Sequence, residues 1–193
     1  NTEAYEFYLK AKHKYAKREN TDDTEIARGL LNKAIELDDN LIAAKNLLGV
    51  TYREMGYYDK AMEMYTSALK QSEELGDKRG MGKSLNSIGL VYSDKGDYDK
   101  ALDYYDRSIV VEEELGDKKG IGYSLNNIGI VHGIKGNLDT ALGYFERAFE
   151  QEEKLGDKRG IGVVFTNIGN VHANKGDYDK ALDYYDRSLA IFE

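Results

Sequence analysis

The chain has 193 residues, a formal net charge of −8 at pH 7, and neither cysteine nor proline. The acidic balance disfavours a nucleic acid as partner, because binding a phosphate backbone needs clustered Lys and Arg. The lack of cysteine excludes disulfides and thiol catalysis and favours a cytoplasmic location, and no apolar run approaches the roughly 18 residues that cross a membrane.

The first two predicted helices cover residues 4–18 and 24–37 and are joined by residues 19–23. In the second of them, apolar residues recur at helical spacing as Ala27, Leu31 and Ala34. Lys12 stands in the first helix at the position where the later hairpins place a glycine. We therefore expect residues 1–39 to form a divergent first hairpin that caps the rest of the chain.

Residues 76–115 form a unit that begins again at Gly116 and at Gly156, each time after 40 residues. Residues 96–108 recur letter for letter as residues 176–188. A fixed period in this range is typical of stacked repeat arrays. We therefore expect residues 1–193 to form a single repeat domain. After the first hairpin, its repeats would be residues 40–75, 76–115, 116–155 and 156–193.

Each unit contains two amphipathic patterns separated by a short turn. The first has Leu85, Ile88, Gly89 and Tyr92 at helical spacing, and the second has Tyr98, Ala101, Leu102, Tyr105, Ser108 and Ile109. Gly96 stands where a helix end favours a left-handed residue, and Asp97 follows as an N-cap. Such a short turn predicts an antiparallel hairpin. The small residues Gly89 and Ala101 are expected to face each other, so that the two backbones approach closely.

The pattern (L/F)-x-x-I-G-x-x-(Y/H), followed by A-x-x-x-(Y/F)-x-x-(S/A), resembles the tetratricopeptide repeat, a helix-turn-helix unit normally of 34 residues. The resemblance covers residues 40–193 and, less closely, residues 2–39. The second helices run on as E-E-E-L near Glu113, which makes them longer than in the 34-residue form and similar to those of kinesin light chain adaptors. The resemblance implies an all-α fold: a right-handed α-solenoid of about five antiparallel hairpins.

The last predicted helix presents an apolar set with no later helix to cover it, namely Leu182, Tyr185, Leu189 and Phe192. Repeat arrays need polar end caps to remain soluble. We therefore expect the last repeat to be truncated and the natural protein to continue.

Two stretches resemble ligand-binding motifs but lack required residues. Residues 80–84 (GMGKS) lack the glycine that a phosphate loop needs five residues before Gly82, since that position is Asp77. The acidic residues 94–106 place Asp99 where a calcium loop requires glycine. N-caps and a solvated helix face account for these carboxylates.

His132 and His172 lie 40 residues apart and occupy the position held by Tyr52 and Tyr92 in earlier repeats. They are therefore predicted to be interior hairpin residues rather than metal ligands or a general base. Since the chain also lacks a catalytic triad or a distinctive pair of acids, we expect no enzyme activity, no metal and no cofactor.

A second stripe of residues remains on each first helix once the core is assigned. In the tetratricopeptide family the first helices line the concave wall, so the resemblance implies that this stripe faces the groove. The candidate peptide-binding residues are Asn46, Arg53, Lys83, Asn86, Leu90, Tyr123, Asn126, Asn127, Ile130, Asn167, Asn170 and Asn174.

Asparagine recurs on the stripe: Asn46, Asn86 and Asn126 share one position of the repeat, and Asn127 and Asn167 share the next. A primary amide has two donors and an acceptor, so a row of amides can bind the backbone of an extended peptide. Alternatively, these amides bond only to neighbouring helix ends or water. Apolar residues on the same stripe favour ligand pockets; they are Leu90, Tyr123, Ile130 and Ile134.

The leading hypothesis is a non-enzymatic module that holds an extended peptide or a helical segment of a partner protein in its concave groove. A second hypothesis is a regulatory arm of a larger signalling enzyme, such as a nucleotide cyclase or kinase. A third is self-assembly through the uncovered last helix, giving a homo-oligomer.

Overall fold

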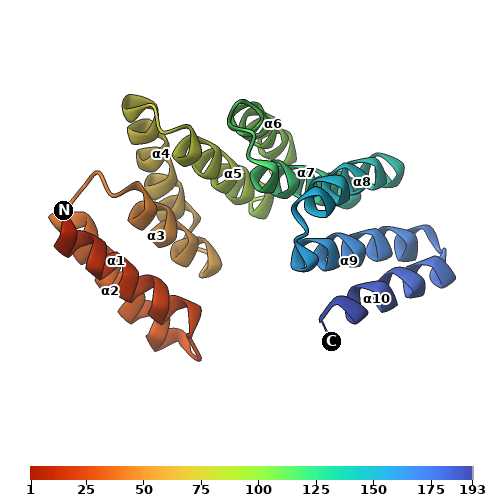
Figure 1. Cartoon of the computed structure of the whole chain (residues 1–193), viewed down its shortest axis with the longest axis horizontal. Helices are drawn as coiled ribbons and strands as arrows, with labels where there is room; N and C mark the ends of the chain where they lie inside the picture. Colours follow the sequence, from red (N-terminus) through yellow and green to blue (C-terminus); the bar gives the residue numbers. More distant parts are fainter. Residues whose placement is uncertain (193) are drawn as a thin grey trace. The chain divides into compact units, whose positions relative to one another are not determined.

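The computed structural model describes residues 1–192, and every element in this range is an α-helix (Figure 1). The helices are α1 (Thr2–Ala16), α2 (Thr21–Leu37), α3 (Ile42–Glu54), α4 (Tyr58–Leu75), α5 (Lys78–Asp94), α6 (Tyr98–Leu115), α7 (Lys118–Ile134), α8 (Leu138–Leu155), α9 (Lys158–Lys175) and α10 (Tyr178–Phe192). The all-α class and the helical repeats predicted from the sequence are confirmed.

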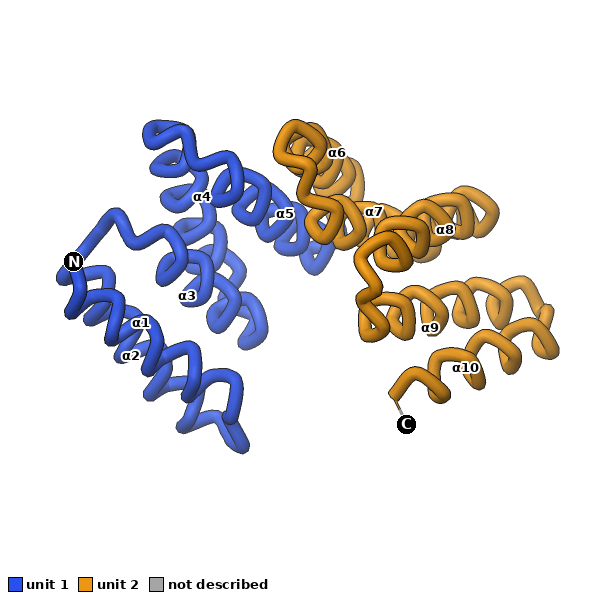
Figure 2. Tube along the Cα trace, viewed as in Figure 1, with its two compact units in different colours: residues 1–96 blue, residues 97–193 orange. Residues whose placement is uncertain are grey.

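The helices form two compact units, residues 1–96 and 97–193 (Figure 2). In the first unit α1 pairs with α2 and α3 with α4, and α5 packs against α3 and α4. In the second unit α7 pairs with α8 and α9 with α10, while α6 packs against α7 and α8 packs against α9. Each unit therefore contains both kinds of contact on which a repeat protein depends, within a hairpin and between neighbouring hairpins.

The glycine–aspartate turns fold as the sequence predicts. Gly96 has a φ of 79°, in the left-handed region that favours glycine. The Asp97 side chain then accepts a hydrogen bond from the backbone N–H of Lys100 at 3.4 Å. At the start of α5, Asp77 accepts from the N–H of Gly80 at 3.0 Å. These bonds satisfy donors in the first helical turn, which have no partner within the helix.

In the hairpins that lie within one unit, the recurring glycine of the first helix packs against an aromatic ring of the second. A Cβ atom added to Gly129 would lie 2.7 Å from Phe145 Cε1, and one added to Gly169 would lie 2.6 Å from Tyr185 Cε1. The alanine predicted to face this glycine is also close in the last hairpin, where the Ala181 backbone oxygen lies 3.2 Å from a Cβ added to Gly169. The nearest side chain is the ring that follows the alanine by one helical turn, because a large ring fills the space that the missing side chain leaves.

The first hairpin differs from its predicted boundaries. Helix α1 begins at Thr2 because the Asn1 side chain accepts hydrogen bonds from the N–H groups of Glu3 and Ala4. The connection ends at Asn20, whose side chain accepts from the N–H of Asp23 at 3.0 Å. The predicted connection, residues 19–23, therefore contains the cap and the first turn of α2.

At the position where the sequence predicts a small residue in the second half of α1, Ala11 is buried and its neighbour Lys12 is exposed. Ala11 belongs to a core cluster with Leu31 and Ala34 of α2 and with Leu48 of α3. The missing glycine therefore does not prevent packing of this hairpin, because alanine one position earlier allows the helices to meet.

As predicted, His132 and His172 are interior hairpin residues: both are half-buried, on the second half of α7 and α9. The His132 ring stacks on Tyr144 with a centroid distance of 5.4 Å, and the His172 ring stacks on Tyr184 at 5.7 Å. Each stack joins the two helices of one hairpin, so these residues take part in packing.

Candidate peptide-binding face

In the first unit, the candidate residues on α3 and α5 are joined across neighbouring hairpins. Asn46 Oδ1 accepts a hydrogen bond from Ser84 Oγ at 3.2 Å. Arg53 Nη1 lies 3.0 Å from Asp94 Oδ2 in an ion pair. Lys83 is exposed, whereas the remaining two candidates on α5, Asn86 and Leu90, are half-buried.

In the second unit, the candidates lie on α7 and α9. Asn167 Nδ2 donates a hydrogen bond to Asn126 Oδ1 at 2.8 Å, so these two amides link consecutive hairpins. Asn127 is half-buried, like both partners of this bond. The alternative that some of the asparagines bond to neighbouring helices therefore describes this pair.

The more accessible polar candidates are at the far end of α9. Asn170 and Asn174 are both exposed. Asn170 Oδ1 accepts a hydrogen bond from the Tyr185 hydroxyl of α10 at 2.7 Å, which fixes the orientation of its amide. The amide group of Asn170 is therefore held in place on an open surface.

Exposed apolar side chains accompany these amides. Tyr123 and Ile130 of α7 are 51% and 37% exposed. Two further side chains of the stripe are exposed as well. Ile134, which the sequence analysis named among the apolar residues of the stripe, is 57% exposed, and Val163 of α9, at the position equivalent to Tyr123, is 45% exposed.

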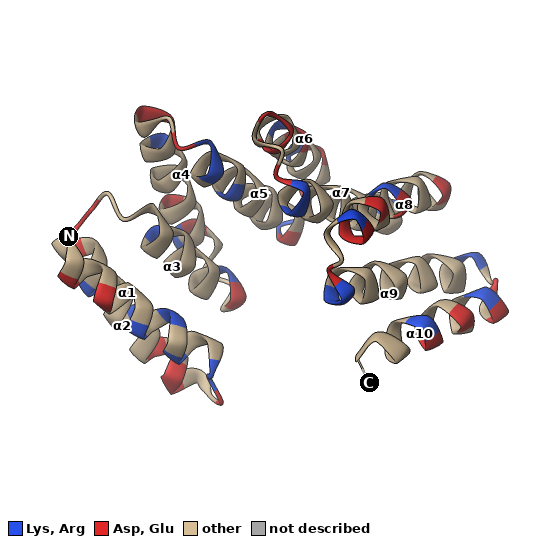
Figure 3. Cartoon of the chain, in the orientation of Figure 1, with Lys and Arg blue, Asp and Glu red and all other residues tan. Residues whose placement is uncertain are grey.

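The face made by α7 and α9 carries no charged side chain between its ends, although Lys119, which pairs with Asp157, lies 5.7 Å from the Tyr123 ring centroid at one end. Both helices have Lys or Arg only in the first turn, apart from Lys175 at the end of α9. In Figure 3 the ribbon of α9 accordingly lacks charged residues between its ends. In the first unit, by contrast, Lys83 and the pair Arg53–Asp94 place charges on α3 and α5. We refer below to the surface of Tyr123, Ile130, Val163, Asn167, Asn170 and Asn174 as the α7–α9 face.

Two carboxylates that the sequence pattern does not single out are buried between the helices of the second unit. Glu112 of α6 is 5% exposed and accepts hydrogen bonds from Ser108 Oγ and Ser124 Oγ, each at 2.9 Å. Burial raises the pKa of Glu112, although both hydroxyls oppose this shift by stabilising the charge.

Glu152 of α8 occupies the equivalent position and is 2% exposed. Its carboxylate lies against Gly122 and Gly160, and within the described chain its Oε2 atom has no hydrogen-bond partner. Burial, followed by the nearby negative charge of Asp157, raises the pKa of Glu152. The matching position in the first unit is Ser72. The sequence signal was therefore that an acidic residue stands where the earlier repeat has a serine.

Across residues 1–192, no helix is both long and apolar enough to cross a lipid bilayer. The same residues bring together no group of three His, Asp or Glu side chains that could hold a metal ion.

A family model of the tetratricopeptide repeat matches residues 40–110 and 120–193. The chain belongs to the tetratricopeptide repeat family. Membership of this family indicates a protein-interaction scaffold. The members of the family are generally non-catalytic. Among curated proteins, none matches the sequence closely.

Several solved structures share this tetratricopeptide repeat fold. BtubC (BKLC) from P. vanneervenii has 25% identity and a TM-score of 0.72, over 88% of this chain and 73% of that one. Aspartyl phosphate phosphatase F from Bacillus subtilis has 17% identity and a TM-score of 0.74, over 98% and 60%. MamA has 20% identity and a TM-score of 0.56, over 88% and 89%. The last two similarities concern the fold alone.

Proposed function

We propose that the chain is a non-catalytic interaction module that holds an extended, uncharged segment of a partner protein on the α7–α9 face. The observation that carries this proposal is the combination of exposed amides and exposed apolar side chains on a surface that has no charged residue between its ends. Apolar side chains open to solvent on an otherwise polar face are typical of interaction sites.

The residues of the face have different roles in this proposal. Asn170 and Asn174 hydrogen-bond the partner's backbone, which gives affinity without reading its sequence. Tyr123, Ile130 and Val163 contact apolar side chains of the segment and supply selectivity. Asn126 and Asn167 bond to each other and set the spacing of the two helices. A short peptide bound in this way would have a Kd of about 1 μM, typical of a small interface.

The test begins with peptides selected from a random library for binding to the wild-type chain. Calorimetry on the selected peptides should show that the double variant Asn170→Ala, Asn174→Ala weakens binding about tenfold, and that Tyr123→Ala does so as well. Asn32→Ala changes an exposed asparagine on α2 and serves as the control. Equal affinity of all variants, with unchanged helical content, would show that the face does not bind.

One observation favours a second candidate function, self-assembly through α10. Leu182 and Leu189 of this helix are 59% and 58% exposed. At the position equivalent to Leu189, Phe149 of α8 stacks on Phe165 of α9 with a centroid distance of 5.4 Å. If a second copy covers this face, light scattering will show a dimer or larger species that Leu189→Lys converts to monomer. A monomer at high concentration would exclude this function.

A further inference from the structure

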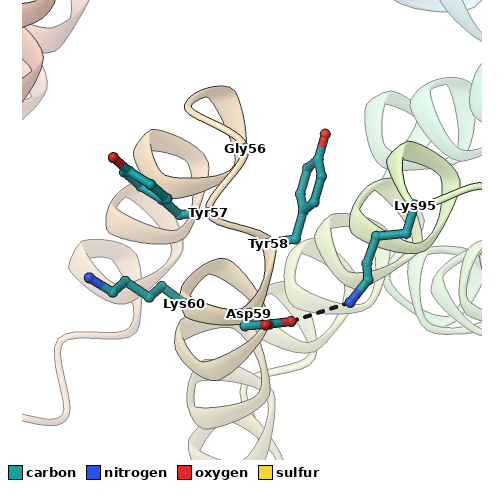
Figure 4. Close-up of a pocket in the computed structure, with 6 residues that line it drawn as sticks. All are labelled: Gly56, Tyr57, Tyr58, Asp59, Lys60 and Lys95. Carbon is teal, nitrogen blue, oxygen red and sulfur yellow. Dashed lines mark hydrogen bonds and ion pairs between the residues drawn. The ribbon is translucent and has the colours of Figure 1, made fainter.

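The turn between α3 and α4 borders an open pocket of about 450 Å³ in the first unit. Its lining residues are Gly56, Tyr57, Tyr58, Asp59, Lys60 and Lys95. Figure 4 shows the Tyr57 and Tyr58 rings standing apart on the two sides of the turn, with the Lys95 ammonium directed at Asp59. The pocket thus combines two phenol rings with two cations and one carboxylate.

The pair formed by Lys95 and Asp59 belongs to the repeat. The two side chains lie 3.2 Å apart, and equivalent pairs in the second unit are Lys135–Asp99 at 2.7 Å and Lys175–Asp139 at 2.6 Å. Asp59 and Lys95 therefore neutralise each other, as the equivalent pairs do in the second unit. The positive charge that distinguishes the pocket is that of Lys60.

The start of α6 shows one way in which this lysine is neutralised. There Asp97 Oδ2 lies 2.7 Å from Lys100 Nζ. Tyr57 occupies the position of Asp97 and Lys60 that of Lys100, since each lies 40 residues earlier in the repeat. The hairpin α3–α4 has thus kept the cation and replaced its carboxylate partner with an aromatic ring.

Lys60 consequently has a different environment from Lys100. Among the described residues no carboxylate lies within ion-pair distance of its ammonium, which is instead 5.5 Å from the Tyr52 ring centroid and 5.7 Å from that of Tyr57. Tyr57 is 49% exposed and Lys60 is exposed as well, so an incoming anion can reach both the ring and the cation.

We propose that this pocket binds an acidic side chain, Asp or Glu, of a partner peptide. The carboxylate takes the place that Asp97 holds at the start of α6 and pairs with Lys60. The residues that flank it in the peptide pack on the rings of Tyr57 and Tyr58. This site lies in the first unit and requires nothing of the α7–α9 face, so either site can fail without the other.

The test uses the whole chain and two short peptides, acetyl-Phe-Glu-Phe-amide and its match acetyl-Phe-Gln-Phe-amide. In an NMR titration, the glutamate peptide should shift the amide signals of Gly56, Tyr57 and Lys60 and bind at least tenfold more tightly than the glutamine peptide. Equal shifts with both peptides, or no shift in these signals, would overturn the proposal.

Two variants and a matched control localise the effect. Lys60→Gln should weaken binding of the glutamate peptide about tenfold. Tyr57→Asp should abolish binding without lowering the melting temperature, because the new carboxylate pairs with Lys60 as Asp97 does with Lys100. Lys100→Gln removes the same cation where a carboxylate is already present, and should leave binding unchanged. Wild-type affinity in the Lys60→Gln or Tyr57→Asp variant would contradict the proposed site.

Discussion

Two glycines on neighbouring helices of the second unit differ in what surrounds them. Gly129 of α7 faces the Phe145 ring, whereas no atom lies within 4 Å of the position that a Cβ would take on Gly143 of α8. Phe145 is 2% exposed, so its ring has little space into which to move. The first glycine is therefore required by packing, and the second only lowers helix propensity.

We predict that Gly129→Ala lowers the free energy of unfolding by about 1–3 kcal/mol, since the added methyl group forces the Phe145 ring from its place. Gly143→Ala should raise it by up to about 1 kcal/mol, the difference in helix propensity between the two residues. Urea unfolding followed by circular dichroism measures both. Similar effects of the two substitutions would show that the glycine–ring contact does not matter.

Glu152 makes stability depend on pH. Its pKa in the folded chain is raised above the ordinary value of 4.5 because burial disfavours the charged form. The stabilising contribution of the protonated carboxyl is thus complete below about pH 4.5 and is lost as the pH rises through the folded-state pKa. At neutral pH the charged Glu152 carboxylate therefore destabilises the folded chain.

Glu152→Gln, which resembles the protonated acid, should therefore raise the melting temperature at pH 7 by about 2–4 °C, equivalent to about 1 kcal/mol in a chain of this size. The advantage should shrink as the pH falls through the folded-state pKa and should be absent below about pH 4.5. Thermal unfolding across this pH range measures it. Glu153→Gln changes an exposed neighbour and should show no such trend; a matching trend would mean that net charge alone is responsible.

At the level of single residues, the sequence could predict the stripe of amides but not their hydrogen bonds. The bond between Asn126 and Asn167 joins two hairpins, so it depends on how far apart α7 and α9 lie. The burial of Glu112 escaped prediction for a related reason. Glu112 lies in an acidic run of the kind that is typical of a solvated helix face. It becomes enclosed only because α7 packs against α6 and places Ser124 beside it.

At the level of helices, most helix ends could be predicted from the residues at the turns. Glycine followed by aspartate marks the turns before α5, α6, α7, α9 and α10, and the structure has its helix ends there. The first hairpin was placed less well because it lacks this dipeptide and uses Asn1 and Asn20 as caps instead. A register counted from the expected glycine then selected Lys12 where Ala11 is buried.

The N-caps give a direct test at this scale. Asp77 bonds the N–H of Gly80, whereas Asn137 at the start of α8 makes no side-chain cap bond. Asp77→Ala should cost about 1 kcal/mol, because it leaves a first-turn donor without its acceptor. Asn137→Ala should cost clearly less. Equal losses in denaturant unfolding would mean that the two turns are stabilised by something other than their caps.

At the level of the whole molecule, a fixed period identified the family, because each repeat buries its apolar side only against its neighbours. The same periodicity says little about partners, since binding residues are those that depart from it. Tyr57 departs by replacing an aspartate, and Asn170 and Asn174 depart by making part of α9 polar without charge. Departures of this kind become interpretable only when the surrounding helices show what each side chain can reach.

The two proposed sites differ in their dependence on salt. Raising the ionic strength from about 0.1 M to about 1 M reduces the Debye length from about 10 Å to about 3 Å, which screens exposed charges but leaves hydrogen bonds and apolar contacts largely unaffected. The glutamate peptide at Lys60 should therefore bind several-fold more weakly at high salt. A peptide selected on the α7–α9 face should largely keep its affinity, because the contacts proposed there are hydrogen bonds and apolar contacts. Calorimetric titrations of both peptides at the two salt concentrations measure the difference, and an equal response of both would show that they share one site.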